Sequence, residues 1–332
     1  MSGFEYFTIE ANGSKATIAS RGAVVTKWTV PTEDASGNHA GAVDVLDGYQ
    51  SQAELEAFDG YRGALLAPWS NRIRQATYTH EGRTYDCGPD EDGVRQALHG
   101  LVAKEEFTLV RCEGDTVVLS ARVESEAYPQ PLTVTVEYRL EQDLHSWQLH
   151  MRMNCSNDGT GVAPVALGWH PYIKLDGGRE GAYVSLPART QVVTDEALIP
   201  LPGEAAFEPY GGFDSDSGYA RVDLTQALDT AFTDLTMRPG QRAQTTATLH
   251  HASGAVTEVT ALSGNPLSTG VGIFHIFTGE CLHDRPGQSV AVEYCQCMTD
   301  AYNRPECGQV LALKPGSSRD LTVTIRHTPT PA

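Results

Sequence analysis

Polar and hydrophobic residues alternate with a period of two along much of the chain. The stretch LTVTVEYRL (132–140) is a clear example, in which Val134 and Val136 alternate with Thr135 and Glu137. Successive side chains of a β-strand point to opposite faces, so this pattern predicts a strand with one buried face and one solvent-exposed face.

The same pattern predicts many strands and very little helix. A helical pattern is found only in the short stretch SQAELEAF (51–58), and the sequence contains neither an internal repeat nor a long Pro-, Gly- or Ser-rich linker. We therefore expect an all-β protein, a large antiparallel two-sheet β-sandwich that forms one domain over residues 1–332. Strands are expected at 23–30, 116–123, 146–155, 256–262, 272–277, 289–298 and 320–326, with a hairpin of 76–80 and 83–87 joined through Glu81 and Gly82.

Composition narrows the class of protein and of ligand. The 332 residues include 40% hydrophobic and 20% charged side chains, as in soluble globular proteins. No apolar run is long enough to cross a membrane, and the N-terminus lacks the features of a secretion signal, which predicts a cytoplasmic location. With 24 basic and 42 acidic residues the net charge is -18. This charge disfavours nucleic acids and anionic membranes and favours a neutral small molecule.

The cysteines give no indication of a metal centre. Seven are scattered along the chain, and no CxxC pair has the spacing of zinc ligands. We expect reduced thiols, no metal and no cofactor. Whether the chain forms a homodimer is left open by the sequence.

The stretch SVAVEYCQCM (289–298) contains a carboxylate in an unusual setting. Glu293 shares one strand face with Ala291 and Cys295, while Val292 and Tyr294 lie on the other, so neither face is expected to contact bulk water. Burial would raise the pKa of such a carboxyl group, which suits a general base. The alternative is a structural glutamate paired with an arginine or with backbone amides.

Four further stretches carry polar groups suited to chemistry, although each also has an ordinary structural explanation. Asn71 and Arg72 in NRIR can orient hydroxyls or form surface contacts, and His99 in LHG can serve as a structural hydrogen-bonding group. His170, in VALGWHPYIKL, precedes a proline that interrupts a strand, which suggests an edge or a cleft. In the same stretch Trp169 and Tyr172 can stack on a sugar or belong to the core. Asp229, in QALDTAF, fits a turn as well as a site.

Taken together and in order, these motifs resemble the aldose 1-epimerase (galactose mutarotase) family over nearly the whole chain. The resemblance rests on Asn-Arg-Ile at 71–73, Leu-His-Gly at 98–100, His-Pro-Tyr at 170–172, Leu-Asp at 228–229 and Val-Glu-Tyr at 292–294, before AYNRPE.

The resemblance implies a β-sandwich that binds a monosaccharide and interconverts its α and β anomers without a cofactor. By position, Glu293 is implied as the general base and His170 as the general acid. Arg72 and His99 are implied to hold the sugar, and Asp229 to accept hydrogen bonds from its hydroxyls. Asn71 and Trp169 complete the expected binding residues.

Two details depart from the best-known members and leave the substrate open. A single glycine follows His99 where the galactose enzymes usually have two, and Gly-Trp-His-Pro-Tyr replaces their usual Asn-His and aromatic pair. A hexose-phosphate 1-epimerase would need further cations, for which Arg74 and Lys174 are available. The sequence is also compatible with a glycoside hydrolase that uses Glu293 and Asp229, and with a sandwich that binds sugar without catalysis.

Overall fold

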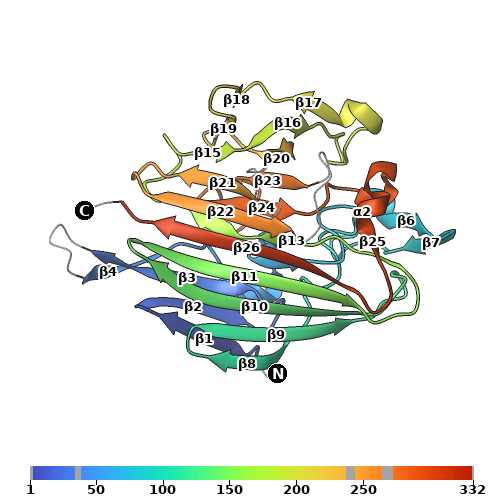
Figure 1. The fold of residues 1–332 in the computed structure, drawn as a ribbon, viewed down its shortest axis with the longest axis horizontal. Helices are drawn as coiled ribbons and strands as arrows, with labels where there is room; N and C mark the ends of the chain where they lie inside the picture. The colour runs from blue at the N-terminus through green and yellow to red at the C-terminus, as the bar shows by residue number, and fades with distance from the viewer. Residues whose placement is uncertain (1–2, 34–38, 237–243, 264–271, 331–332) are drawn as a thin grey trace.

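The computed structural model describes residues 3–33, 39–236, 244–263 and 272–330, and within them two large antiparallel sheets dominate (Figure 1). The long strands of one sheet run side by side across the molecule. In order across this ten-stranded sheet they are β18 (Phe213–Asp214), β19 (Tyr219–Asp223), β15 (Tyr183–Leu186), β21 (Gln244–His250), β22 (Val256–Ser263), β26 (Ser318–Thr328), β11 (Ser146–Asn157), β10 (Leu132–Asp143), β9 (Thr116–Val123) and β8 (Thr108–Glu113).

The second large sheet has eight strands and carries the residues of interest. Its strands are β17 (Phe207–Pro209), β16 (Ala188–Val192), β20 (Asp229–Leu235), β23 (Ile273–Phe277), β24 (Ser289–Cys295), β13 (Gly168–His170) and β5 (Ala64–Leu66), with β14 (Tyr172–Lys174) also paired to β24.

Smaller elements complete the fold. A four-stranded sheet contains β1 (Tyr6–Ala11), β2 (Ser14–Ala19), β3 (Val25–Glu33) and β4 (His39–Asp44), and the pairs are β6 (Thr77–His80) with β7 (Arg83–Asp86) and β12 (Ala163–Pro164) with β25 (Ala312–Leu313). The α-helices are α1 (Gln52–Ala57) and α2 (Gly308–Leu311), and the 3-10 turns are Asp59–Tyr61, Arg74–Ala76, Gly203–Ala206, Ala301–Asn303 and Pro305–Cys307.

The main hydrophobic core is shared by the two large sheets. Val136 of β10, Met151 of β11 and Val323 of β26 belong to the same buried cluster as Phe274 of β23 and Val292 of β24. This contact between two sheet faces confirms the predicted all-β sandwich. It also fixes the orientation of the second sheet, because residues that alternate with these core positions must point to its other face.

The local predictions can be compared with the observed elements. The hairpin forms with Thr77 opposite Asp86, and both turn residues, Glu81 and Gly82, have positive φ, as a two-residue hairpin turn requires. The predicted strands are confirmed, and so is α1, whose first turn is capped by the side chain of Ser51. The one-turn helix α2 was not predicted. The single-domain boundary at 1–332 stays a prediction.

Of the two positions that Pro171 suggested, an edge or a cleft, the edge is contradicted by the structure and the cleft stays a prediction. Pro171 does separate β13 from β14, as its missing N–H requires. However, β13 does not lie at an edge, because it pairs with β24 on one side and with β5 on the other. The described part of the chain contains no helix long and apolar enough to cross a membrane.

Candidate active site

Four adjacent strands of the eight-stranded sheet bring four titratable side chains together. Across the order β20, β23, β24 and β13, these strands contribute Asp229, His275, Glu293 and His170. His275 lies directly opposite Glu293 in the antiparallel register, so both side chains point to the same face. Their strand neighbours pack in the core, which places this cluster on the face away from it.

Glu293 and His170 are in direct contact. A carboxylate oxygen of Glu293 lies 3.1 Å from Nε2 of His170, and the two side chains are only 2% and 5% exposed. Burial raises the pKa of Glu293 to about 7 and lowers that of His170 to about 3, since both charged forms lose hydration. The ligand-free pair therefore holds one proton over a wide pH range.

Asp229 and His275 form a second acid-base pair beside the first. Their side chains are joined by a 2.6 Å hydrogen bond between Nε2 of His275 and Oδ1 of Asp229. Burial opposes charge on both, but this bond and the charge of Glu293 leave the pKa of His275 raised. Likewise the bond outweighs burial for Asp229, whose pKa is lowered. We infer an imidazolium next to Glu293.

Several polar atoms of this cluster have no partner within the described residues. They are Nδ1 of His170, Nδ1 of His275 and Oε2 of Glu293, all buried. Buried polar atoms are normally hydrogen-bonded, so a group of unpaired ones marks a place where the protein keeps its bonding capacity for another molecule.

Two hydrogen bonds join His99 to Asn71, and each has a backbone N–H as its donor. The N–H of Asn71 donates to Nδ1 of His99 at 3.3 Å, and the N–H of His99 donates to the carbonyl of Asn71 at 2.9 Å. Burial lowers the pKa of His99 well below its usual value, so the ring is neutral and its proton sits on Nε2. Gly100 follows because its φ is +80° and a Cβ there would lie 2.2 Å from the carbonyl oxygen of Ala67.

Arg72 borders the cluster and is held in a fixed orientation. Its backbone N–H and its Nη1 both donate to Oδ1 of Asn71, at 2.9 and 3.1 Å, and its Nε donates to Gln96 at 3.0 Å. Its positive charge lowers the pKa of Glu293, after burial has raised it, and also that of Asp229. Asn71 thus orients Arg72 and His99, and its side-chain oxygen is already occupied.

Neighbouring side chains hold the ring of His170 in place. It stacks on Tyr172 with ring centres 5.0 Å apart and planes inclined by 7°. The guanidinium of Arg62 lies 4.9 Å from the Tyr172 ring and forms a buried ion pair with Asp47. The His99 ring lies 5.2 Å from that of His170. These contacts restrict the imidazole to one orientation.

Trp169 does not join the cluster. It follows the strand alternation, so its ring points away from the His170 side and into the core, where it is fully buried and lies 6.3 Å from the ring of Tyr138. Its Nε1 donates to the carbonyl of Gly63 at 3.0 Å. This position does not support the expected stacking of Trp169 on a sugar.

The family assignment follows from a comparison of the whole chain with known proteins. The model of the family described as aldose 1-epimerase matches residues 5–326. The chain belongs to the aldose 1-epimerase family. It is therefore an enzyme of the isomerase class that acts on carbohydrates.

The individual proteins that match this chain share only a minority of residues with it. Galactose mutarotase of Bos taurus is 28% identical, with 96% of this chain and 92% of that protein covered. The uncharacterized protein YihR of Escherichia coli is 31% identical over 42% of this chain and 44% of that protein. The crystal structure of a GalM/aldose epimerase homologue from C. elegans has a TM-score of 0.78 at 20% identity, covering 97% of this chain and 98% of that one. This last similarity shows the fold.

His275 is the member of this aldose 1-epimerase cluster that the sequence analysis missed. It lies in GIFHIF, which was recognised as a strand, but a single histidine among apolar residues is usually structural. The alternation in GIFHIF gives no signal for it, because Ile273 and Phe277 on the face of His275 are as apolar as Phe274 and Ile276 on the other face. Its partner Asp229 is 46 positions away in sequence, and no local pattern joins the two.

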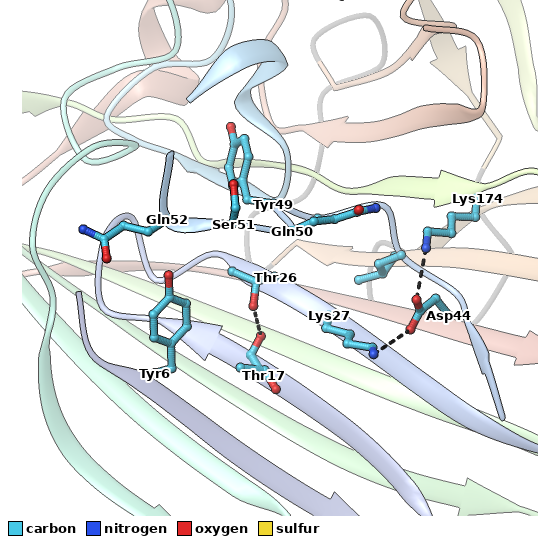
Figure 2. Close-up of a pocket in the computed structure, with 12 residues that line it drawn as sticks. Tyr6, Thr17, Thr26, Lys27, Asp44, Tyr49, Gln50, Ser51, Gln52 and Lys174 are labelled. Carbon is cyan, nitrogen blue, oxygen red and sulfur yellow. Dashed lines mark hydrogen bonds and ion pairs between the residues drawn. The ribbon is translucent and has the colours of Figure 1, made fainter. Parts of the chain in front are cut away.

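A separate hollow of this aldose 1-epimerase family member is lined by residues that are unsuited to general acid-base catalysis. It has a volume of about 640 Å³ and is lined by polar residues, including Tyr6, Gln50 and Gln52. Figure 2 shows Lys27 and Lys174 pointing toward Asp44, with N–O distances of 3.8 and 3.1 Å. Among the described residues that line it there is no histidine and no carboxylate besides Asp44.

No metal cluster accompanies the site in the described part of the chain. There, no three or more His, Cys, Asp or Glu side chains are arranged to hold a metal ion. The chemistry available from the side chains themselves is proton transfer between a carboxyl group and an imidazole, with Arg72 and His99 as hydrogen-bond donors.

Proposed function

We propose that this chain is an aldose 1-epimerase that interconverts the α and β anomers of a free aldohexose. The observation that supports this most directly is the buried contact between Glu293 and His170, a carboxyl group and an imidazole that together hold one transferable proton. Mutarotation needs only one proton removed and one delivered at the same acetal, so such a pair is sufficient.

In the proposed reaction the sugar enters between Glu293 and His170 and replaces their contact. In the free enzyme the proton of the pair lies on Glu293, and in the proposed reaction it passes to His170 as the sugar binds. Glu293 then takes the proton of the anomeric hydroxyl, while His170 delivers its proton to the ring oxygen, and the C1–O5 bond breaks to give the open aldehyde. Rotation about the C1–C2 bond exposes the other face of the carbonyl. Closure with the roles reversed restores both groups, so the pair carries one proton throughout the cycle.

The surrounding groups fit the binding and support of such a reaction. Arg72 and His99 can donate to sugar oxygens, and Asp229 can accept from a hydroxyl, since its side chain is 34% exposed. His275, held by Asp229, favours the ionised form of Glu293 once the carboxyl group has lost its proton. In this role His275 is a positioning residue that acts through Glu293.

The direct test is polarimetry on freshly dissolved α-D-glucose and α-D-galactose. Addition of native protein is expected to bring the optical rotation to equilibrium faster than the uncatalysed reaction, with a rate proportional to protein concentration. Identical time courses with native and heat-denatured protein, on both sugars, would rule out the proposed activity on these hexoses.

The pH dependence is expected to follow the single proton of the pair. Because the free enzyme loses this proton as pH rises through about 7, kcat/KM should be level in the weakly acidic range and fall above that value. Measurement of kcat/KM from pH 5 to 9, with the buffer-catalysed rate subtracted, checks this. A kcat/KM that increases with pH through 7 would mean that the fully deprotonated pair is the active form.

Replacement of His275 should change the pH at which kcat/KM falls. The imidazolium lowers the pKa of Glu293, so His275→Gln is expected to shift the fall in kcat/KM to higher pH and to reduce its maximum. His150→Gln, at a partly buried histidine of β11 in the other large sheet, is the matched control and should leave the profile unchanged. If His275→Gln lowers the rate without moving the profile, its influence is structural only.

The phosphorylated-substrate alternative receives less support. Of the two cations considered for a phosphate, Lys174 is paired with Asp44 in the separate hollow of Figure 2, and Arg74 is paired with Asp195 at 3.2 Å. The direct contact between Glu293 and His170, whose pKa values burial shifts in opposite directions, favours proton transfer over binding of a sugar without catalysis.

A further inference from the structure

The hollow shown in Figure 2 is separate from the proposed active site and has a chemistry of its own. Its volume of about 640 Å³ is within the usual range for small-molecule sites. Its walls come from β1, β2 and β3 of the four-stranded sheet, from the segment 44–52 and from Lys174 of β14. None of the described residues that line it belongs to the cluster around Glu293. A ligand bound here would therefore not occupy the place of the substrate.

Two lysines line this hollow, although lysine is rare in the chain. The sequence contains five lysines, at positions 15, 27, 104, 174 and 314, and two of them, Lys27 and Lys174, belong to the hollow. The chain as a whole has a net charge of -18. Two ammonium groups in one concave site of such an acidic protein provide a local attraction for an anion that the rest of the surface repels.

The carboxylate of Asp44 offsets only part of this positive charge. Nζ of Lys174 donates to Oδ2 of Asp44 at 3.1 Å, whereas Nζ of Lys27 lies 3.8 Å from Oδ1, too far for a hydrogen bond. The side chain of Lys27 is also 60% exposed. One carboxylate thus faces two ammonium groups, and the N–H donors of Lys27 are available to a ligand.

The other walls carry mainly hydroxyl and amide groups. Figure 2 shows Lys27 and Lys174 at one end of the hollow and Tyr6 and Gln52 at the other. Side-chain hydroxyls and amides both donate and accept hydrogen bonds, which suits the hydroxyl groups of a sugar. Of the described residues that line the hollow, only Leu46 has an aliphatic apolar side chain. The walls therefore favour a hydrophilic ligand over an apolar one.

Backbone contacts fix the walls of the hollow relative to one another. Gly48 packs so closely on β3 that a Cβ there would lie 2.3 Å from the carbonyl oxygen of Thr26. On the opposite side of the segment 44–52, the backbone N–H of Lys174 donates to the carbonyl of Val45 at 2.9 Å. A ligand then binds to walls that are already assembled, which lowers the entropy cost of binding.

We propose that this hollow is a binding site for a sugar that carries one acidic group, a phosphate or a carboxylate. The ammonium groups of Lys27 and Lys174 hold the acidic group, and the hydroxyl and amide groups of the other walls hold the sugar hydroxyls. This inference goes beyond the proposed activity and does not depend on it, because the hollow and the cluster around Glu293 share no described residue.

Isothermal titration calorimetry with the full chain tests the proposal. The probes are glucose 6-phosphate and glucuronate, which have similar sugar rings and different acidic groups, so the tighter of the two identifies the acidic group. We expect that probe to bind at least about tenfold more tightly than inorganic phosphate, since phosphate alone lacks the hydroxyls. Inorganic phosphate that binds as tightly as both probes would overturn the assignment to a sugar, and no binding of either probe at about 10 mM would overturn the site itself.

Lysine variants test whether the ammonium groups hold the acidic group. Lys27→Gln and Lys174→Gln keep a polar side chain but remove the charge, so each should weaken binding of the preferred probe by about tenfold. Both lysines are partly exposed, and the fold should be retained. Lys314→Gln, at an exposed lysine that directly follows β25, is the matched control and should leave the Kd unchanged. Equal affinities of native protein, Lys27→Gln and Lys174→Gln would contradict the proposed site.

Competition with a neutral sugar distinguishes this site from the proposed active site. Excess D-galactose, which the proposed function directs to the cluster around Glu293, should leave the Kd of the preferred probe unchanged. Displacement of the probe by galactose would assign the acidic sugar to the active site and overturn the inference. If the protein fails to accelerate mutarotation, the proposed function is wrong, whereas binding that depends on Lys27 and Lys174 would still support this site.

Discussion

Replacement of Glu293 by glutamine is expected to lower the rate of anomer exchange by about 10²- to 10⁴-fold, the usual contribution of a positioned general base. The amide has the shape of the carboxyl group but accepts no proton from the anomeric hydroxyl. In the native protein a carboxylate oxygen of Glu293 lies 3.1 Å from His170. The amide of the variant keeps a polar group at this position, so the fold should be retained. Polarimetry with α-D-galactose and a thermal melt of both proteins measure the two effects.

The chain supplies its own control for this change. Glu137 occupies the same Val-Glu-Tyr tripeptide on β10, but its side chain is 38% exposed and lies 3.5 Å from that of Arg111. Glu137→Gln should therefore leave the rate within about twofold of native, because it removes only a weak surface ion pair. A Glu293→Gln protein as active as Glu137→Gln would remove Glu293 from the mechanism.

The contrast between these two glutamates shows what a sequence reveals about a site. In both strands the alternation of residues predicts which side chains share a face. The apolar neighbours on both faces of β24 correctly indicated that Glu293 is buried. Burial is a local property of a strand pattern. The fold class could be predicted for the same reason, since many local patterns all indicated strands.

Pairwise contacts depend on tertiary register, which the local pattern does not contain. The bond between His275 and Asp229 joins β23 to β20, and the contact between Glu293 and His170 joins β24 to β13. Family resemblance supplied candidates for three of these four residues, but no distance between them. His275 was outside the resemblance and was missed.

Trp169 was expected to contact the sugar, although the strand alternation already indicates that its ring points away from the His170 side. It directly precedes His170 in a strand, so the two side chains point to opposite faces. A tryptophan beside a candidate catalytic histidine is attractive as a sugar-stacking residue, but only residues at even spacing from His170 can share its face. Tyr172 has that spacing, yet Pro171 separates the two strands, and its ring stacks on His170 itself.

Replacement of His170 by asparagine is expected to reduce the rate by about 10²- to 10⁴-fold, since the imidazole that contacts Glu293 and delivers the proton to the ring oxygen is then lost. The shorter side chain leaves space beside the Tyr172 ring, on which the imidazole of His170 now stacks. Added imidazole should therefore restore part of the activity in a concentration-dependent manner. A purely structural loss would not respond to imidazole, and His150→Asn controls for the loss of a histidine elsewhere.

The double variant Glu293→Gln with His170→Asn provides the decisive comparison. If the two groups transfer protons within one cycle, removal of either one already disables the pair, and the double variant should be about as slow as the slower single variant. Two independent contributions would instead multiply, giving a loss near the product of the single losses. Stopped-flow polarimetry at matched concentrations distinguishes these results, and multiplied losses would contradict a mechanism in which Glu293 and His170 share one proton.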